Sequence, residues 1–293
     1  GFLTSESLWQ LKDLPKKLAV LGAGPIGCEL AQAFARLGSE VILIESGTRI
    51  LAKEDPEVSD LLESSFLEDG LKVKTAYKVT QFMFKDGKKY LAASGKDGSF
   101  VTDFDEILIA VGRKARTDGF GLEELNIELD EQGKILADEF LRTKYPNIYA
   151  CGDVTGPFQL THAASHQAWY VAVNALFGRF KKFKVDYSII PWATFTDPEI
   201  ARVGINEIEA KLQGIDYEVV TYGIDDLDRA IADGNDKGFV KVILEQGKDR
   251  VLGALIAGEN SAEIITEFIN AMKHGYGLND ILSTIHIYPS YSE

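Results

Sequence analysis

The stretch Lys17–Ala31, KLAVLGAGPIGCELA, decides the fold. Its first six residues are a short apolar run that ends in glycine, and the residues that follow Gly27 place apolar side chains at helical spacing. Gly22, Gly24 and Gly27 have the G-x-G-x-x-G spacing. Glycine at these positions allows a tight turn, close approach of the backbone to a pyrophosphate, and close packing of the helix on the strand. The stretch therefore predicts a strand, a phosphate-binding loop and a helix.

The next strand supplies an acid that sharpens this prediction. The run EVILIE (40–45) is typical of a buried strand, and Glu45 ends it 18 residues after Gly27. A carboxylate there can accept hydrogen bonds from the adenine-ribose diol, and it would repel a 2′-phosphate. We therefore predict NAD as the cofactor, with NADP kept as the alternative because Arg49 lies nearby.

The remaining pattern divides the chain into three parts. A helix over 57–70, a β-meander with turns at Asp86-Gly87 and Asp97-Gly98, and a return strand over 106–112 complete an α/β unit with a doubly wound sheet. A second part combines a short helix in GLEEL (121–125), two small strands and a helix over 162–177. Strands followed by a helix over 261–274 indicate an α+β sheet. The predicted boundaries are 1–117, 118–187 and 188–293.

Composition excludes several classes of function. The net charge of -14 argues against nucleic acid or anionic membranes as partners. No apolar run is long enough to span a bilayer, and no signal peptide is visible at the start. The two cysteines, Cys28 and Cys151, lie far apart and favour a reducing, cytoplasmic setting, with both as small buried residues. No metal site is predicted.

Several motifs together resemble one family. TKYPNIYACGD (143–153) resembles the second flavin motif of the pyridine nucleotide-disulfide oxidoreductases. Four further stretches match that family in order and spacing: LPKKLAVLGAGPIGCELA, ILIAVGRKART, FTDPEIARVG and the final HIYPSYSE. The chain is thus identified as similar to this family, with lipoamide dehydrogenases and mercuric reductases as the nearest members. The resemblance implies a Rossmann-like NAD-binding domain, a central segment that contacts FAD, and a dimerisation domain that forms a homodimer.

The resemblance also assigns roles to single residues. Gly152 and Asp153 correspond to the Gly-Asp whose aspartate binds the ribityl chain of FAD, and Ala163 opens a helix whose amides face the flavin. Gly112 corresponds to a glycine beside the nicotinamide dinucleotide, although a plain turn is the alternative and the usual Pro-Asn after it is absent. Glu29 corresponds to a glutamate near the flavin; a first-turn glutamate favoured by the helix dipole is the alternative.

The chain ends in a variant of the family's terminal active-site motif. Aligned on Pro289 and Glu293, the sequence has Tyr288 where lipoamide dehydrogenases carry the histidine that accepts the thiol proton and that the glutamate orients. Tyrosine, with a pKa near ~10, is a poor general base at neutral pH. His286 lies on the same side of an extended segment, about 6.6 Å away, and is the alternative base. The resemblance further implies that the bond between Tyr288 and Pro289 is cis.

The family's FAD-binding half, with its redox cysteine pair, has no counterpart in this sequence. We therefore expect the chain to be a portion of a longer enzyme and to be inactive alone. The expected function of the whole is transfer of electrons from NADH through FAD to a disulfide or a thiolate-bound metal. Two alternatives stay open: a transhydrogenase-like flavoprotein without a redox disulfide, and a non-catalytic dinucleotide-binding dimerisation module.

Overall fold

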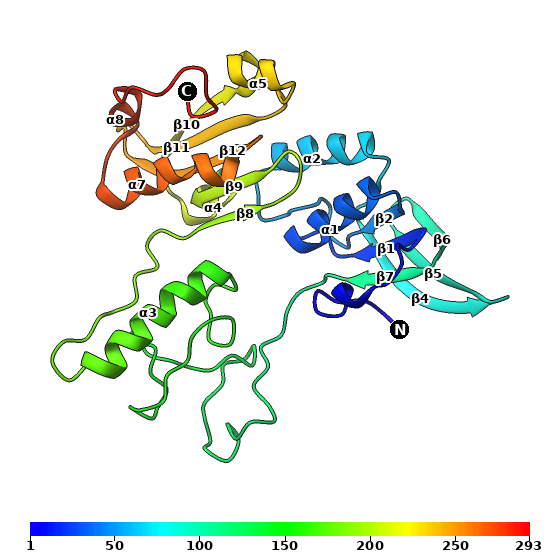
Figure 1. The fold of residues 1–293 in the computed structure, drawn as a ribbon, viewed down its shortest axis with the longest axis horizontal. Coiled ribbons are helices and arrows are strands. Elements are labelled where there is room, and N and C mark those ends of the chain that lie inside the picture. Colours follow the sequence, from blue (N-terminus) through cyan, green and yellow to red (C-terminus); the bar gives the residue numbers. More distant parts are fainter. The chain divides into compact units, whose positions relative to one another are not determined.

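The computed structural model describes every residue from Gly1 to Glu293. It divides into two compact units, one made of residues 1–111 together with 191–293 and the other of residues 112–190 (Figure 1). None of the helices combines the length and the apolar character needed to cross a bilayer. The mixed α/β architecture expected from the sequence is confirmed, and the three sequence-based boundaries stay a prediction.

A four-stranded parallel sheet carries the glycine loop. Its order is β3-β2-β1-β7, and each neighbouring pair is parallel. The chain therefore reverses its strand order next to β1, and in such sheets ligands bind beside the carboxyl ends of the strands at this point. Helices α1 and α2 cover one face with a shared apolar core. The elements are β1 (Lys17–Leu21), α1 (Pro25–Arg36), β2 (Glu40–Ile44), α2 (Pro56–Glu68), β3 (Lys72–Lys74) and β7 (Glu106–Ile109).

The other face of the parallel sheet is covered by the predicted β-meander. Its strands are β4 (Tyr77–Lys85), β5 (Lys88–Gly95) and β6 (Gly98–Phe104), paired antiparallel in chain order. Asp86 and Gly87 both have positive φ, as a two-residue hairpin turn requires. Leu91, Ala93 and Phe104 of the meander pack with Ala19 and Ile44 of the parallel sheet.

A five-stranded antiparallel sheet of order β10-β11-β12-β9-β8 completes this unit. Helix α7 lies across one face (Figure 1), and Gly275, with φ of 75°, ends it. The helix expected over 261–274 is split into α6 and α7 at Ile265. The elements are β8 (Pro191–Thr194), β9 (Ile200–Gly204), α4 (Glu207–Gln213), β10 (Tyr217–Gly223), α5 (Asp228–Asp233), β11 (Phe239–Glu245), β12 (Val251–Ala257), α6 (Ser261–Ile264), α7 (Thr266–His274) and α8 (Leu278–Leu282), with 3-10 turns η1 (Leu8–Gln10) and η2 (Ile224–Asp226).

The layer of helices on the parallel sheet shares a core with the five-stranded sheet of this unit. Ile200, Leu255 and Ala257 of the antiparallel sheet belong to the same buried cluster as Val58 and Leu62 of α2. The fold therefore fixes the position of the antiparallel sheet relative to the glycine loop.

The second unit is built around the 17-residue helix α3 (Thr161–Phe177). Ile127, Ile135 and Ala150 form its small core. The helix expected in GLEEL is wrong: that stretch makes only turns between Gly121 and Asn126, both with positive φ. The two expected small strands are reduced to isolated bridges, Leu129 with Ile135 and Arg142 with Tyr149.

Candidate dinucleotide and redox site

The glycine loop has the geometry that its sequence predicts. Gly22 has φ of 94°, and a Cβ there would lie 2.6 Å from the carbonyl oxygen of Ala110 at the end of β7. A Cβ on Gly27 would lie 1.9 Å from the Gly22 carbonyl oxygen, so only glycine permits this helix–strand contact. Gly24 is the N-cap of α1 and has open space where a side chain would be. The loop thus leaves its backbone accessible at the positive end of the helix dipole.

Glu45 holds this loop from the neighbouring strand. Its carboxylate accepts the Ala23 amide at 2.8 Å and the Gly47 amide at 2.6 Å. Partial burial raises the pKa of the Glu45 carboxyl, but these hydrogen bonds outweigh it and leave the pKa below its ordinary value. Glu45 is therefore ionised at neutral pH. Its Oε1 also accepts the Ser46 hydroxyl at 3.2 Å, whereas Oε2 accepts only the Ala23 amide and keeps a lone pair for a further donor.

Glu29 joins α1 to the segment that follows β8. Its Oε1 accepts the Phe195 amide at 2.8 Å, and burial raises the pKa of the carboxyl although this hydrogen bond opposes the rise. Gln32 lies about one turn further along α1 and is 3% exposed. Its side-chain amide donates to the Asp197 carbonyl and accepts from the Asp197 amide, each at 2.8 Å. These contacts fix the orientation of α1 on the antiparallel part of the unit.

The two cysteines differ in environment. Cys28 is fully buried, burial raises the pKa of its thiol, and its Sγ donates to the Ala23 carbonyl at 3.4 Å. The expectation that Cys151 is buried is wrong, because its side chain is exposed. The cause is local: Cys151 lies between the core residue Ala150 and Gly152, whose φ of 81° turns the chain.

Three of the predicted flavin-binding residues, Gly152, Asp153 and Ala163, lie in the second unit, whereas Glu29 belongs to the first. Asp153 pairs with Arg113 at 2.8 Å. Arg113 directly follows Gly112, which has a φ of 133° that only glycine adopts readily. The Gly152 amide donates to Oε1 of Gln167, which is fully buried and also donates to the Gly156 carbonyl at 3.0 Å.

Helix α3 begins without a capping side chain. Its N-cap, Leu160, makes no side-chain hydrogen bond, and the first intrahelical bond runs from the Ala164 amide to the Leu160 carbonyl. Ala163 is 1% exposed and lies in this first turn. The first amides of a helix have no intrahelical acceptor, so this end of α3 can receive hydrogen-bond acceptors from a ligand.

The terminal segment presents two side chains that are each paired with a carboxylate. Nε2 of His286 lies 2.9 Å from Oε1 of Glu267 on α7. The Tyr288 hydroxyl donates to Asp228 at 2.6 Å, and this bond raises the pKa of the tyrosine. The Tyr288-Pro289 bond is cis, as the sequence comparison implied. Glu293 is exposed, and its amide lies 3.4 Å from the Ser290 carbonyl.

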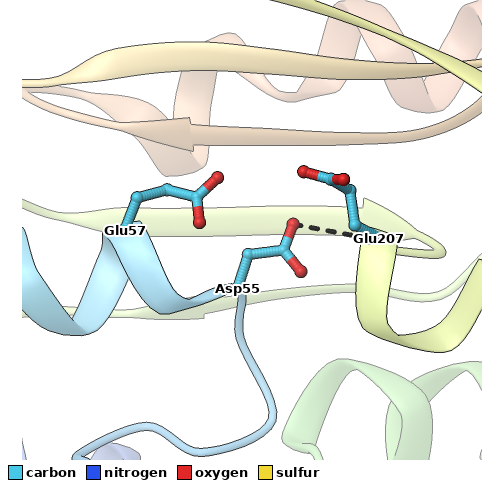
Figure 2. A group of neighbouring side chains, drawn as sticks. All are labelled: Asp55, Glu57 and Glu207. Carbon is cyan, nitrogen blue, oxygen red and sulfur yellow. Dashed lines mark hydrogen bonds between the residues drawn. The ribbon is translucent and has the colours of Figure 1, made fainter. Parts of the chain in front are cut away.

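A third group of titratable side chains lies where α2 meets the antiparallel sheet. Figure 2 shows the carboxylates of Asp55 and Glu57, from the start of α2, pointing toward that of Glu207 on α4. Their oxygens lie within 4.8 Å of one another, a spacing that could hold a metal ion. However, Nζ of Lys241 contacts all three, at 2.9 Å from Asp55 and 2.5 Å from Glu207. One ammonium group therefore already lies among the three carboxylates and offsets one of their charges.

A buried arginine lies beside this cluster. Arg202 is 2% exposed, binds Glu209 with two nitrogens, and lies 4.2 Å from the ring centroid of Trp192. Its Nε is 2.8 Å from Glu54 Oε2, although the two are not aligned for a hydrogen bond. Burial raises the pKa of Glu54 in spite of the Arg202 charge. Together with Lys241, Arg202 joins the loop before α2 to the antiparallel sheet.

Comparison with known proteins agrees with this geometry. Residues 1–168 match the pyridine nucleotide-disulphide oxidoreductase family model, and residues 190–293 match the dimerisation domain of the same family. The chain belongs to the pyridine nucleotide-disulphide oxidoreductase family. A family member from Chlamydia muridarum, a dihydrolipoyl dehydrogenase, is 35% identical over 99% of the chain, and a mercuric reductase from Streptomyces lividans is 36% identical over 100%. The chain covers 61% of each of these two relatives.

Solved structures of the family share the fold. The HOCl-induced flavoprotein disulfide reductase RclA from Escherichia coli superposes with a TM-score of 0.90 at 30% identity. That likeness covers 100% of this chain and 66% of the RclA chain. The family assignment and the fold class drawn from the sequence are therefore confirmed.

Three partners of the site residues were missed by the sequence analysis. Gln167 binds Gly152, Glu267 binds His286, and Asp228 binds Tyr288. Helix α3 also carries other polar residues, such as His166 and Asn174, so no local pattern singled out Gln167. Asp228 is 60 positions from Tyr288, and no local pattern connects them.

Proposed function

We propose that this chain supplies the pyridine-nucleotide site and the dimerisation domain of an FAD-dependent oxidoreductase. In this enzyme electrons pass from NADH through FAD to a disulfide or to a metal ion held by thiolates. The observation that carries the proposal is the glycine loop that Glu45 holds in place through the Ala23 amide. The family's name and the names of the relatives support the reaction class.

The residues of the loop fit a dinucleotide. The open space at Gly24 would admit the pyrophosphate, and the amides of Ile26 and Gly27 at the start of α1 would donate to it. Glu45, ionised and with a lone pair left on Oε2, would accept a hydrogen bond from the adenine-ribose diol. The nicotinamide of a bound NADH supplies the hydride. A 2′-phosphate on the ribose would face the Glu45 carboxylate, so the proposal favours NAD over NADP.

The second unit fits the ribityl and ring portions of a flavin. Asp153 would accept a hydrogen bond from a ribityl hydroxyl, with Arg113 holding the carboxylate in its orientation. The first amides of α3, around Ala163, would donate to polar atoms of the ring. Gln167 would keep Gly152 in its turn conformation. Glu29, with its raised pKa, is proposed to lie near the flavin.

For the terminal segment we assign proton exchange to His286 and hydrogen-bond donation to Tyr288. Glu267 fixes one ring nitrogen of His286, which leaves the other for a substrate thiol. Tyr288 keeps its proton because Asp228 raises the pKa of the hydroxyl, so it can donate a hydrogen bond but is a poor base. The proposed orienting role of Glu293 is not needed in this arrangement.

Rapid mixing of the whole flavoprotein tests this division of roles. Flavin reduction by NADH should be unchanged in His286→Gln and Tyr288→Phe, whereas reoxidation by a disulfide should slow by about tenfold or more in His286→Gln. Unchanged reoxidation in both variants would remove the terminal segment from the mechanism. Reoxidation by a nicotinamide analogue but not by disulfides would favour the transhydrogenase-like flavoprotein. A protein that never retains flavin would favour the non-catalytic dinucleotide-binding dimerisation module.

We also propose a homodimer formed through residues 190–293. The match of this range to the family's dimerisation domain supports it. Light scattering at micromolar concentration should give twice the mass of one chain, and a monomer would argue against the assignment.

A further inference from the structure

A cavity lies in the unit of residues 112–190, away from the residues assigned above. It has a volume of about 230 Å³ and opens where α3 ends. Its wall combines aromatic and basic side chains, and no carboxylate lines it. The residues that matter here are Phe140, Arg142, Tyr149, Asn174, Arg179 and Lys182.

One wall of this cavity is a turn held by Asp138. Its Oδ1 accepts the amides of Phe140 and Arg142, each at 2.9 Å, and its Oδ2 holds the Arg142 guanidinium at 2.6 Å. Leu141, between them, is buried and has φ of 65°, a conformation rare for a branched side chain. The turn therefore holds Phe140 and Arg142 in fixed positions before any ligand arrives.

The opposite wall is the loop after α3, which Asn174 holds. This side chain is 5% exposed; it donates to the Phe183 carbonyl at 2.8 Å and accepts the Phe183 amide at 2.7 Å. Lys182, one residue before, has its Nζ 5.6 Å from the centroid of the Phe140 ring, and the Arg142 guanidinium lies 5.4 Å from the same centroid. Two cations are thus held at one aromatic ring.

The charges of the cavity do not cancel. Asp138 compensates Arg142, but neither Arg179 nor Lys182 has a carboxylate within ion-pair distance. The C-terminus of α3 contributes about half a negative charge. About one and a half positive charges therefore remain, in a chain whose net charge is -14.

We propose that this cavity binds the phosphoryl group of a small anionic ligand. A phosphate monoester carries about -1.5 to -2 charges at neutral pH, which matches the uncompensated charge. Arg142 uses only Nε and Nη2 on Asp138, so Nη1 keeps donors for phosphate oxygens. The volume lies below the range of about 300–1,000 Å³ typical of drug-sized ligands, so it fits a phosphoryl group with a small organic part.

Trp169 provides a signal for binding. Its ring lies 5.8 Å from the ring of Phe183, the residue that Asn174 holds, so movement of the loop should alter its fluorescence. The protein, with Trp9→Phe to reduce background, would be titrated with inorganic phosphate, pyrophosphate and phenyl phosphate. Arg179→Gln and Lys182→Gln remove the uncompensated charges. Lys181→Gln is the matched control, because Lys181 lies in the same loop but outside the cavity.

We expect saturable binding that Arg179→Gln and Lys182→Gln each weaken by about tenfold and Lys181→Gln by less than about twofold. Tighter binding of phenyl phosphate than of inorganic phosphate would identify a phosphorylated organic molecule as the ligand class, and equal binding would identify free phosphate or pyrophosphate. The absence of saturation by any probe up to about 10 mM would overturn the proposal. Equal weakening by Lys181→Gln would also overturn it, because that result indicates general attraction to a basic loop.

Discussion

Replacement of Lys241 by methionine should be the most destabilising single substitution at the junction between α2 and the antiparallel sheet. The side chains of Lys241 and Asp55 are 4% and 1% exposed. Burial lowers the pKa of the Lys241 ammonium, but its hydrogen bonds to Glu207, Glu57 and Asp55 outweigh this effect and raise the pKa above its ordinary value. Truncation of one partner of a buried ion pair costs about 3–5 kcal/mol. Two carboxylates about 4.8 Å apart repel by about 3.5 kcal/mol at an effective dielectric constant of 20, which is of the same size.

The pH dependence of this loss has a definite sign. Lys241 lowers the pKa of Glu207, so in the parent protein this contribution is present above the ordinary carboxylate pKa and is lost only as the pH falls through the lowered value. Without Lys241 the three carboxylates repel, and protonation relieves the repulsion. The variant should therefore lose about 3–5 kcal/mol at pH 8 and distinctly less near pH 5.5.

Urea unfolding measures this loss at the junction itself when it is followed by the fluorescence of Trp192 with Trp9→Phe and Trp169→Phe in every variant. Asp55→Asn combined with Lys241→Met should recover part of the stability at pH 8, because one charge of the triad is gone. The matched control is Lys237→Met, which breaks an exposed pair with Glu68 and should shift the unfolding midpoint little. Equal losses in Lys241→Met and Lys237→Met, or a loss independent of pH, would refute the reasoning.

Further predictions concern the two units separately. Glu45→Gln keeps one acceptor but turns an amide toward a backbone donor, so calorimetry should show NADH affinity lower by about tenfold, equivalent to a loss of about 1.4 kcal/mol. NADH affinity should stay constant as the pH falls to about 4.5 and weaken only below it, because the pKa of Glu45 is lowered from its ordinary value and the carboxylate stays ionised above that value; weakening already between pH 7 and pH 4.5 would contradict this. Gly27→Ala should abolish NADH binding and lower the melting temperature, since its Cβ would lie 1.9 Å from the Gly22 carbonyl oxygen. Gln167→Leu strands the Gly152 amide and should destabilise residues 112–190 by about 1–3 kcal/mol, detectable as faster hydrogen exchange there; unchanged exchange would argue against the buried network.

The sequence was sufficient wherever a requirement is local. Gly22 and Gly27 are predictable because the chain conformation and the close helix–strand contact demand glycine at fixed spacing. The Asp86-Gly87 turn follows from the conformations that a two-residue hairpin needs. The prediction of a helix in GLEEL was wrong because its helix propensity competes with Gly121 and Asn126, whose positive φ ends the segment after a single turn.

Contacts between distant positions were out of reach. Lys241 lies 186 positions from Asp55, and a lysine in an apolar strand gives no indication of which carboxylates surround it. Glu45 was predicted as a ribose ligand, but its bond to the Ala23 amide depends on how β2 lies beside β1. His286 was weighed only as a lone base, since Glu267 reaches it through the packing of the terminal segment on α7.

Calorimetric titration of this chain with NADH and with NADPH tests the central claim most directly. The arrangement of Gly24, the start of α1 and the ionised Glu45 predicts saturable binding of one NADH per chain, and weaker binding of NADPH because its 2′-phosphate meets the Glu45 carboxylate. Tighter binding of NADPH, or no binding of either nucleotide, would contradict the account.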